Sequence, residues 1–336
     1  MEKQRIRIVD IAEQLGVSTA TVSNVIHGKT AKISDTTVKM VQQKLEEMQY
    51  IPNMAGILLA QNNSRIIGVL INDHPKYEGK VLEDGFISAS LNALVKVTNE
   101  AGYFMMVQIT TDWNEVKKIA SMWNMDGIIL IGFCEADYQN LRDKMHIPFV
   151  VYDGYFQTAN NIVNLTIDHF DGGYQAGKFA RERGFQKAMC LSDNHICMDL
   201  ERMEGFQKGF GNEVFRCQVP MKKSERIRFY EEHFDEISRY PLVFAVSDFY
   251  AAEYIRFMQS KGKRVPEDIS VIGFDGSPLG EYCVPALTTI RQDPDLRAKE
   301  AMKALEGLKN KAQIESPIVL PVELVVRESV AEGKAQ

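Results

Sequence analysis

Apolar residues recur at helical spacing in the first fifty residues of the chain. Gly16 and the pair His27-Gly28 interrupt the pattern where helices commonly end, and Ser18 and Ser34 are suitable N-caps for the stretches that follow them. The pattern therefore predicts three short helices. Their inward positions are Ile8, Ile11, Ala12, Leu15, Val22, Val25, Ile26, Val38, Val41, Leu45 and Met48.

Three short helices with a tight turn between the first two fit a helix-turn-helix, a motif whose second helix enters the DNA major groove. A three-helix scaffold for protein contacts has the same apolar spacing, so the pattern alone leaves both interpretations open. The second helix lies in VSTATVSNVIHG (17–28), which holds no basic residue and presents Thr, Ser and Asn instead.

From Ile66 onward, short apolar runs alternate with amphipathic helical stretches. Alternation of strands and helices predicts an α/β fold with parallel sheets, and so many strands suit two lobes better than one. The runs that predict strands are IIGVLI, YFMMVQI, DGIILIGF, PFVVYDG, IVNLTID, KAMCLSD, PLVFAVSD and SVIGFDG, and helical stretches such as ISASLNALVKVTNEAG and AAEYIRFMQSKG lie between them.

Polar residues follow many of these strands, at the edge of the sheet where ligands bind in open α/β folds. A loop Asp also commonly caps a helix, so the recurrence of these residues carries the prediction of a pocket better than any single member does. The strand-end residues are Asn72, Asp73, Asp153, Asp193, Ser247, Asp248 and Asp275.

The stretch YIPNMAGILLAQNNSR (50–65) joins the helical head to the α/β part. Asn53 is a possible cap for a short helix over 54–60, which would carry Met54, Ile57, Leu58 and Leu59 on almost every side. A surface linker is rarely so apolar, so we expect this segment to pack against a partner.

Composition limits the class of protein. The chain has 336 residues, enough for two or three domains, and a net charge of −6. Residues 1–48 hold seven Lys or Arg and six Asp or Glu, a balance of +1, so charge alone does not identify a DNA-binding head. The charged start MEKQRIRIVDIAEQ predicts no signal peptide, and no apolar run reaches the length of a membrane span. Five Cys without a CxxC motif predict reduced cytosolic thiols and no zinc site.

These features together resemble transcriptional regulators of the lactose-repressor type, the LacI/GalR family. The resemblance covers nearly the whole chain and depends on the order of its motifs. The head and linker carry IVDIAEQLGVSTATVSNVIHG and VQQKLEEMQYIPNMAGILLA, and the core carries RMEGF, SDFYAAE, EDISVIGFDG and PALTTIRQD. The resemblance implies an all-α helix-turn-helix head and an α/β core of two lobes with parallel sheets, similar to periplasmic binding proteins.

Within that resemblance, Thr19, Ala20 and Asn24 match base-reading positions, and Leu59 matches the residue that is wedged into the central base step. Ser18, Thr21, Ser23 and His27 match positions near phosphate, and Asn53 belongs to the hinge that enters the minor groove. Lys29, Lys32 and the N-terminal Lys3, Arg5 and Arg7 can supply positive charge, although Lys29 and Lys32 can equally belong to a solvated loop. Gly56 disfavours the hinge helix, so we expect the hinge to fold only on DNA.

In the core, Arg202 and Asp275 match positions that usually hold the effector, a guanidinium and a carboxylate that suit vicinal hydroxyls. Asn72, Asp73, Asp153, Ser247 and Asp248 are further candidates. The sequence departs from the family at Gly154 and Gly276, where an Arg and a second Asp are common, and in the longer loop NDHPKYEGKVLEDGF. Aromatic residues Phe133, Tyr155, Phe156 and Phe249 could stack on a sugar or belong to the core.

The resemblance also implies domain limits and partners. We expect a head over 1–50, a hinge over 51–64, a first lobe over 65–164 and 294–320, and a second lobe over 165–293 and 321–330, with crossings near 163–166, 291–295 and 318–322. The expected partners are double-stranded operator DNA, a small carbohydrate effector and a second copy of the chain, in the bacterial, nucleoid-associated cytoplasm. No cofactor, metal or membrane is expected.

Three alternatives stay open. The effector could be a nucleobase or a phosphoprotein instead of a carbohydrate. A sugar receptor without DNA function is disfavoured by the head and by the start of the chain. An enzyme is disfavoured because the chain has no nucleophile elbow, P-loop, GxGxxG motif or metal-spaced His cluster, and its six His are scattered. We therefore expect a ligand-responsive repressor.

Overall fold

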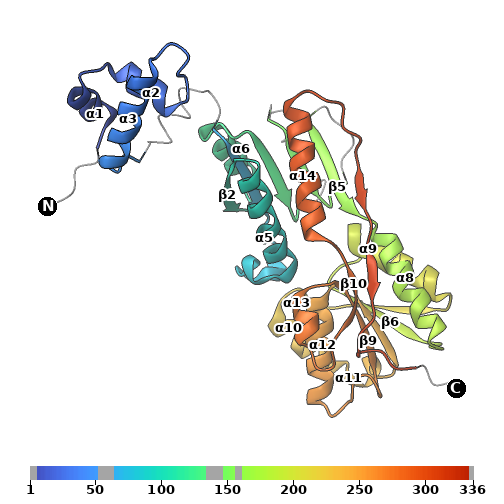
Figure 1. The fold of residues 1–336 in the computed structure, drawn as a ribbon. Helices are drawn as coiled ribbons and strands as arrows, with labels where there is room; N and C mark the ends of the chain where they lie inside the picture. Colours follow the sequence, from blue (N-terminus) through green and yellow to red (C-terminus); the bar gives the residue numbers. More distant parts are fainter. Residues whose placement is uncertain (1–5, 52–63, 134–146, 156–160, 333–336) are drawn as a thin grey trace. The chain divides into compact units, whose positions relative to one another are not determined.

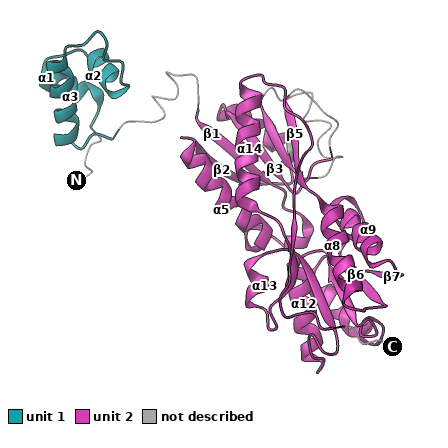
Figure 2. Cartoon of the chain, turned by 45° about the vertical axis from the view of Figure 1, so that its right-hand side comes forward, with its two compact units in different colours: residues 1–64 teal, residues 65–336 magenta. Residues whose placement is uncertain are grey.

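The computed structural model describes residues 6–51, 64–133, 147–155 and 161–332. The chain forms two compact units, residues 1–64 and 65–336, which are drawn in different colours in Figure 2. The second unit contains two lobes, each built on its own six-stranded sheet. None of the helices in the described ranges is long and apolar enough to cross a membrane.

The first unit has the three helices predicted from the apolar spacing. They are α1 (Ile8–Leu15), α2 (Thr19–Ile26) and α3 (Asp35–Glu47). Gly16 ends α1 in the left-handed conformation, and Ser18 and Ser34 cap the next two helices by accepting hydrogen bonds from backbone amides. The small core between the helices contains Ile11, Ala12, Val22, Val25 and Val41.

The first lobe is a parallel sheet in the order β11-β5-β4-β3-β1-β2. Alternate residues of its strands face opposite ways: Ile67, Val69 and Ile71 share a core with α5, and Leu70 shares one with α6. Helices α5 and α14 therefore cover one face and α6 the other (Figure 1). The elements are β1 (Ile66–Ile71), α5 (Gly85–Glu100), β2 (Phe104–Ile109), α6 (Trp113–Met122), β3 (Gly127–Ile131), β4 (Phe149–Tyr152), β5 (Ile162–Ile167), α14 (Pro294–Lys309) and β11 (Ile318–Leu320).

The second lobe has the order β12-β10-β9-β8-β6-β7, with only β12 antiparallel to its neighbour among the described strands. Its strands are β6 (Ala188–Ser192), β7 (Val214–Gln218), β8 (Leu242–Ala245), β9 (Ser270–Asp275), β10 (Thr288–Arg291) and β12 (Glu323–Val325). Its helices are α8 (His169–Glu182), α9 (Cys197–Phe210), α10 (Lys223–Glu232), α11 (Phe234–Ile237), α12 (Asp248–Ser260) and α13 (Pro278–Tyr282).

The chain passes between the lobes three times. The first passage follows β5, which continues to Ile167, so the expected crossing at 163–166 and the expected boundary at 164 are too early: those residues are still strand in the first sheet. The others are Gln292–Asp293, between β10 and α14, and Pro321–Val322, between β11 and β12. The first and third passages are joined by a hydrogen bond from Asp168 N to Leu320 O of 2.9 Å.

Helices α8 and α9 of the second lobe pack unusually close together. A Cβ atom on Gly173 would collide with the backbone oxygen of Arg202, and one on Gly205 would collide with that of Phe170. Gly177 and Gly209 repeat the same relationship one turn further along. This packing fixes the start of α8 against the middle of α9, which matters because His169 of α8 and Arg202 of α9 are bonded to each other beside the cavity described below.

Candidate functional site

The second helix of the head presents a short polar surface. Thr19, Ala20 and Asn24 are exposed, whereas Val22 and Val25 on the opposite side are buried in the small core. The exposed group falls on one side of the helix because residues three to four apart share a face. The residues predicted to read bases are therefore free of the core, and their side chains are short enough for close approach to another surface.

The residues predicted to lie near phosphate are placed less uniformly. Ser18 and Thr21 are tied to each other, since their hydroxyls lie 2.9 Å apart and Ser18 Oγ accepts from Thr21 N at 3.1 Å. Ser23 and His27 are half-buried, and Lys32 is exposed. Ser18 is therefore primarily a helix cap. A contact of Ser18 with phosphate would use the hydrogen-bonding capacity of its hydroxyl that the cap does not occupy.

Several expected residues of the head and linker lie outside the described residues. These are Lys3, Arg5, Asn53, Met54, Gly56, Ile57, Leu58 and Leu59. Arg7 is described, and it forms an exposed ion pair of 3.0 Å with Asp10 at the start of α1.

A cavity of about 450 Å³ lies between the two lobes of the second unit. It opens at the carboxyl ends of the strands of both sheets, as expected for an open α/β fold. Of the seven predicted effector residues, the four that line it are Asp153, Arg202, Ser247 and Asp275. The remaining lining residues are Lys76, Tyr77, Glu78, Lys80, Glu83, Asp84, Phe86, Ile87, Gly132, Met198, Asp199, Lys223, Arg226, Phe249, Tyr250 and Gln292.

Four of the lining residues, Asp153, Arg202, Asp275 and Gln292, belong to a closed ring of polar contacts that joins both lobes. Arg297 Nη2 of the first lobe donates to Asp153 Oδ1 at 2.5 Å, and His169 Nε2 of the second lobe lies 3.0 Å from the same oxygen. Arg202 Nε donates to His169 Nδ1 at 3.1 Å.

Arg202 and Gln292 complete the ring. Arg202 Nη1 lies 3.6 Å from Asp275 Oδ1, and Gln292 Nε2 donates to that oxygen at 2.9 Å. Gln292, on the second passage, accepts from Arg297 Nη1 at 3.0 Å, which returns the ring to the first lobe. A change of any member therefore affects side chains of both lobes.

The ring determines which nitrogen of His169 carries the proton. An Arg guanidinium only donates, so His169 Nδ1 must accept and Nε2 must hold the proton that bonds to Asp153. Burial, followed by the neighbouring positive charge of Arg202, lowers the pKa of His169 to about 4. The imidazole is thus neutral near pH 7, as an acceptor from Arg202 requires.

The two carboxylates of the ring differ in electrostatics. Burial raises the pKa of Asp153, but Arg297 and His169 outweigh it and hold that pKa far below its usual range. Burial raises the pKa of Asp275 to about 8; Arg202 lowers it, while the nearby Asp248 and Asp84 raise it further. Asp275 also has φ of 113°, a strained value for a residue with a side chain, which is consistent with a functional position.

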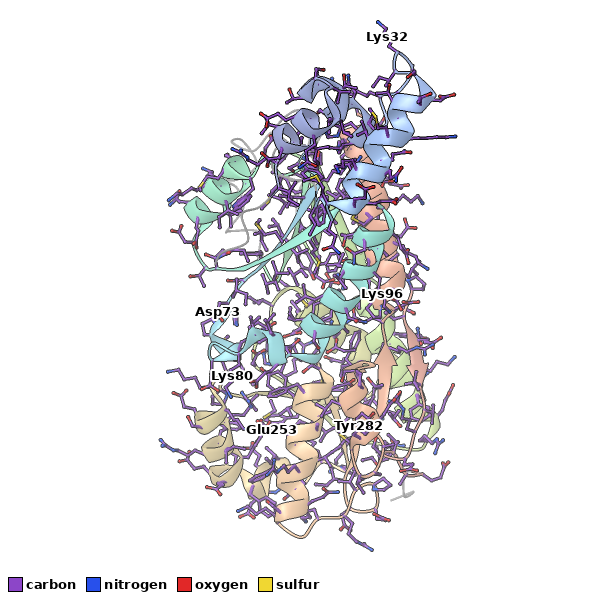
Figure 3. All side chains as sticks on the ribbon, turned by 60° about the vertical axis from the view of Figure 1, so that its left-hand side comes forward. Lys32, Asp73, Lys80, Lys96, Glu253 and Tyr282 are labelled. Atoms are coloured by element: carbon purple, nitrogen blue, oxygen red, sulfur yellow. The ribbon has the colours of Figure 1, made fainter. Side chains whose placement is uncertain are left out.

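Three predicted effector residues do not line the cavity. Asp248 is buried at the start of α12, where its carboxylate accepts from Ser277 N and Thr289 Oγ1, both at 2.6 Å, so it holds neighbouring loops together. Asn72 Nδ2 donates to Gly132 O at 2.9 Å and braces the ends of β1 and β3. Asp73, labelled in Figure 3, is half-buried, and its Oδ1 has no hydrogen-bond partner among the described residues.

The two glycines that depart from the family leave no room for a side chain. A Cβ on Gly154 would lie 2.5 Å from Asn164 Oδ1, and one on Gly276 would lie 2.8 Å from Arg291 Cα. Gly276 also has φ of 68°. The guanidinium beside Asp153 comes instead from Arg297 on α14, far along the chain.

The sequence did not point to His169, Gln292 or Arg297. His169 and Arg297 lie in the first turns of helices, where polar residues are ordinary, and neither follows a strand directly. Among the four predicted aromatics, Phe249 lines the cavity, Phe133 is buried in the first lobe, Tyr155 is half-buried, and Phe156 lies outside the described residues. One available signal was Gln292 in TTIRQD, which directly follows a strand as the other candidates do.

No group of three or more His, Cys, Asp or Glu in the described ranges could hold a metal ion. Cys190, Cys217 and Cys283 are free thiols, and Cys134 lies outside the described ranges.

Similarity to known proteins covers both units. Residues 7–53 match the family model described as bacterial regulatory proteins, lacI family, and residues 177–330 match the model of a periplasmic binding protein-like domain. The HTH-type transcriptional repressor PurR of Vibrio atlanticus is 30% identical over 349 residues, which cover 96% of this chain and 98% of that protein.

Two solved structures share the fold over nearly the whole chain. A lac repressor dimer bound to operator and the anti-inducer ONPF superposes with a TM-score of 0.83 at 22% identity, covering 98% of this chain and all of that chain. A complex of the transcriptional regulator CelR with cellobiose has a TM-score of 0.69 at 21% identity, covering 97% of this chain and all of that one. The predicted two-lobed core with parallel sheets is confirmed, and the chain belongs to the lacI family of bacterial regulatory proteins.

Proposed function

We propose that this chain is a ligand-responsive repressor that binds a pseudo-palindromic operator as a homodimer and takes a small carbohydrate effector between its core lobes. As a lacI-family member with transcriptional repressors as relatives, it is a DNA-binding transcriptional repressor and not an enzyme. The nature of its effector, the assembly, the residues of both sites and a cytoplasmic location are our proposals.

The ring of Asp153, His169, Arg202, Asp275 and Gln292 with Arg297 carries the proposal of ligand control. A ligand in the cavity faces Asp153, Arg202, Asp275 and Gln292 directly, and these same side chains connect the two lobes. Binding that changes their contacts changes the relative stability of lobe arrangements. It shifts the operator-binding population by its differential affinity for the two states, typically about 1–3 kcal/mol.

A carbohydrate suits the cavity because its lining alternates donors, acceptors and aromatic faces. The Arg202 guanidinium and the Asp275 carboxylate group offer a donor and an acceptor to hydroxyls, while Phe86 and Phe249 offer ring surfaces. The cellobiose held by the structurally similar CelR supports a sugar as the occupant. A nucleobase or a phosphoprotein remains the alternative effector.

For the DNA site, we propose that α2 lies in the major groove with Thr19, Ala20 and Asn24 at base edges. An Asn side chain pairs best with the N6/N7 edge of adenine, which predicts an A·T pair opposite Asn24. Ser18, Thr21, Ser23, His27 and Lys32 would approach the phosphates. Asn53 and Leu59 would enter the minor groove, with Leu59 as the wedge at the central step.

Exposed apolar residues on the second lobe support self-association. Tyr282 and Val284 are 82% and 79% exposed. Leu279 of α13 and Phe249 of α12 are also exposed. A groove of about 520 Å³ between α10, α12 and α13 is lined by both Phe249 and Leu279. Tyr282 and Glu253, labelled in Figure 3, lie on this lobe. We propose that a second copy of the chain covers this face, because neighbouring exposed apolar residues commonly mark an interaction surface.

A thermal-shift screen tests the effector proposal. The full chain is heated with neutral sugars, sugar phosphates and nucleobases, and a neutral sugar is expected to raise Tm because it binds the folded state only. The same sugar should change the retardation of operator DNA, which itself should weaken steeply as salt rises. A nucleobase that stabilises the chain when no sugar does would replace the carbohydrate proposal and leave ligand control intact.

A further inference from the structure

The segment between β1 and α5 forms one side of the cavity. It folds into two 3-10 turns, Pro75–Tyr77 and Val81–Glu83, and belongs to the first lobe through the strand and helix on either side. Lys80, labelled in Figure 3, marks its position. The segment contributes Lys76, Tyr77, Glu78, Lys80, Glu83 and Asp84 to the lining, so we call residues 74–84 the lid segment.

One side chain of the lid segment reaches the second lobe. Glu78 Oε2 accepts a hydrogen bond of 3.2 Å from the backbone amide of Lys223, the first residue of α10. Both residues line the cavity. The bond is therefore a second connection between the two lobes, separate from the buried ring.

Helix α10 has a particular need for this carboxylate. Its N-cap, Lys222, makes no side-chain cap hydrogen bond. The amino end of a helix carries a partial positive charge, to which Lys222 and Lys223 add; Glu225 in the first turn pairs with Lys222 at 3.8 Å and offsets part of it. Glu78 satisfies one free amide and offsets this charge, a role that a local Ser, Thr, Asn or Asp usually performs.

The backbone of the lid segment holds Glu78 in a costly conformation. Glu78 has φ of 50° and Gly79 has φ of 76°, so two consecutive residues are left-handed. Glycine adopts this conformation freely, whereas a residue with a Cβ is strained there. The adjacent turns are closed by hydrogen bonds from Glu78 N to Pro75 O and from Lys80 N to Tyr77 O. The backbone conformation thus disfavours a glutamate at position 78, whereas the hydrogen bond that its carboxylate accepts from Lys223 N favours one.

The lobes also touch close to the end of the lid segment. A Cβ on Gly85, the first residue of α5, would lie 3.3 Å from Cβ of Ser277 in the second lobe. The first lobe therefore approaches the second at Glu78, in the middle of the lid segment, and at Gly85, directly after its end, while the cavity keeps room for a ligand.

We propose that Glu78 is a latch that caps α10 across the cavity and holds the two lobes closed without a ligand. The closed arrangement is thus stabilised by the chain itself. The proposal does not depend on the identity of the effector or on DNA binding.

Amide hydrogen exchange of the full chain without ligand tests the latch. Glu78→Gly removes the carboxylate and relieves the strained φ, and Glu78→Gln removes the charge but keeps an acceptor. Loss of the cap should speed exchange of the first turn of α10 about fivefold in Glu78→Gly, and less in Glu78→Gln. Glu83→Gln is the matched control and should leave α10 unchanged, since within the described residues the Glu83 side chain forms an exposed ion pair of 3.7 Å with Lys80, in its own lobe.

The decisive readout lies in the second lobe, in peptides that span residues 221–228. A purely local role of Glu78 predicts that Glu78→Gly slows or does not change exchange in the lid and has no effect on α10. That result, or equal effects of Glu78→Gly and Glu83→Gln on α10, overturns the latch. Circular dichroism of each variant verifies folding, and Glu78→Gln keeps the comparison valid where Glu78→Gly unfolds. A negative result would reject the latch alone, because the proposals of operator binding and effector binding do not depend on Glu78.

Discussion

Arg202 Nε donates to His169 Nδ1 across 3.1 Å, and both side chains are buried. Because the guanidinium has no acceptor, this contact requires a neutral imidazole with its proton on Nε2. That proton then bonds to Asp153 of the other lobe. A carboxylate of the first lobe thus helps to orient Arg202 through the imidazole, together with Val246 O, which accepts from Arg202 Nη1 at 2.6 Å.

Replacement of His169 should change how stability depends on pH. The pKa of His169 is lowered to about 4 from about 6.5, so its contribution to stability is complete above 6.5 and is lost as pH falls towards 4. Glutamine does not titrate. Between pH 7 and 5, the wild type should therefore lose about 1–2 kcal/mol more unfolding free energy than His169→Gln loses. Urea denaturation at the two pH values measures the difference, and parallel losses would show that His169 is not buried neutral.

Asp275 should act in the opposite direction. Burial raises the pKa of Asp275 to about 8, above an unfolded value near 4, so its stabilising contribution exists at acid pH and is lost as pH rises through 8. Between pH 5 and 8, the unfolding free energy of Asp275→Asn should rise by at least about 1 kcal/mol relative to that of the wild type, because Asn bears no charge to bury. Gln292 Nε2 can still donate to the retained oxygen, so the ring stays closed.

The control for Asp275→Asn is Asp268→Asn. Asp268 pairs with Arg264 on the surface, and the neighbouring guanidinium lowers its pKa. The stabilising contribution of Asp268 is lost only at acid pH, below the 5–8 window, so Asp268→Asn should follow the wild type there. If Asp275→Asn also follows the wild type, Asp275 is ionised throughout and its strained backbone requires another explanation.

The close packing of α8 and α9 makes a second stability prediction. A Cβ on Gly173 collides with backbone of α9, which cannot move away as a flexible side chain can, so Gly173→Ala should cost about 3 kcal/mol. The control is Gly307→Ala in α14, where the new Cβ meets only the end of the Ile314 side chain, 2.5 Å away, and better helix propensity offsets the contact. Chemical denaturation of both variants distinguishes them, and equal costs would count against the close approach.

The architecture was largely readable from the apolar pattern, because helices and long buried strands have distinct periods. Short elements were not readable in the same way. β11 and β12 have three residues each, too few to show a period, and β12 is also antiparallel. The first crossing was placed inside β5 because Ile162–Ile167 is buried on both faces, so nothing in the strand marks where it leaves the sheet.

Residues of the cavity could be predicted from the sequence mainly where they directly follow a strand. The expectation that polar residues follow strands found Asp153 and Asp275, which line the cavity, and also Asp248, which caps and braces loops instead. The rule cannot separate the two uses, because both put a carboxylate at the same place. It also could not find His169 or Arg297, since the crossings bring these helix residues to Asp153 from later parts of the chain.

The apolar face of the second lobe leads to a prediction about assembly. Tyr282→Ser combined with Val284→Ser removes the two most exposed apolar side chains of that face, and each should contribute more than about 1 kcal/mol to a dimer interface. The dimer dissociation constant should rise at least about tenfold. Sedimentation measures it, with Ile196→Ser as control, because Ile196 is 59% exposed but precedes α9 instead of belonging to the end of α13. An unchanged constant would place the interface elsewhere.

The polar surface of α2 gives the last prediction, which separates base reading from charge. Asn24 is exposed, and its side chain makes no hydrogen bond among the described residues, whereas Lys32 is exposed beyond the end of α2. Operator sequences are first selected from random DNA with the wild type. Asn24→Ala should then lose about 1–3 kcal/mol of discrimination at one symmetric pair of base positions, where the wild type prefers A·T.

Lys32→Ala supplies the contrast. If Lys32 neutralises a phosphate, its removal weakens binding to every sequence alike and reduces the salt slope by about 1, without relaxing any position. Asn24→Ala should leave the salt slope unchanged, because Asn carries no charge. Uniform weakening by Asn24→Ala, with no base position relaxed, would mean that Asn24 only positions the helix and that Thr19 or Ala20 reads the neighbouring base. The two variants thus assign specificity to the uncharged face of α2 and affinity to the lysine beside it.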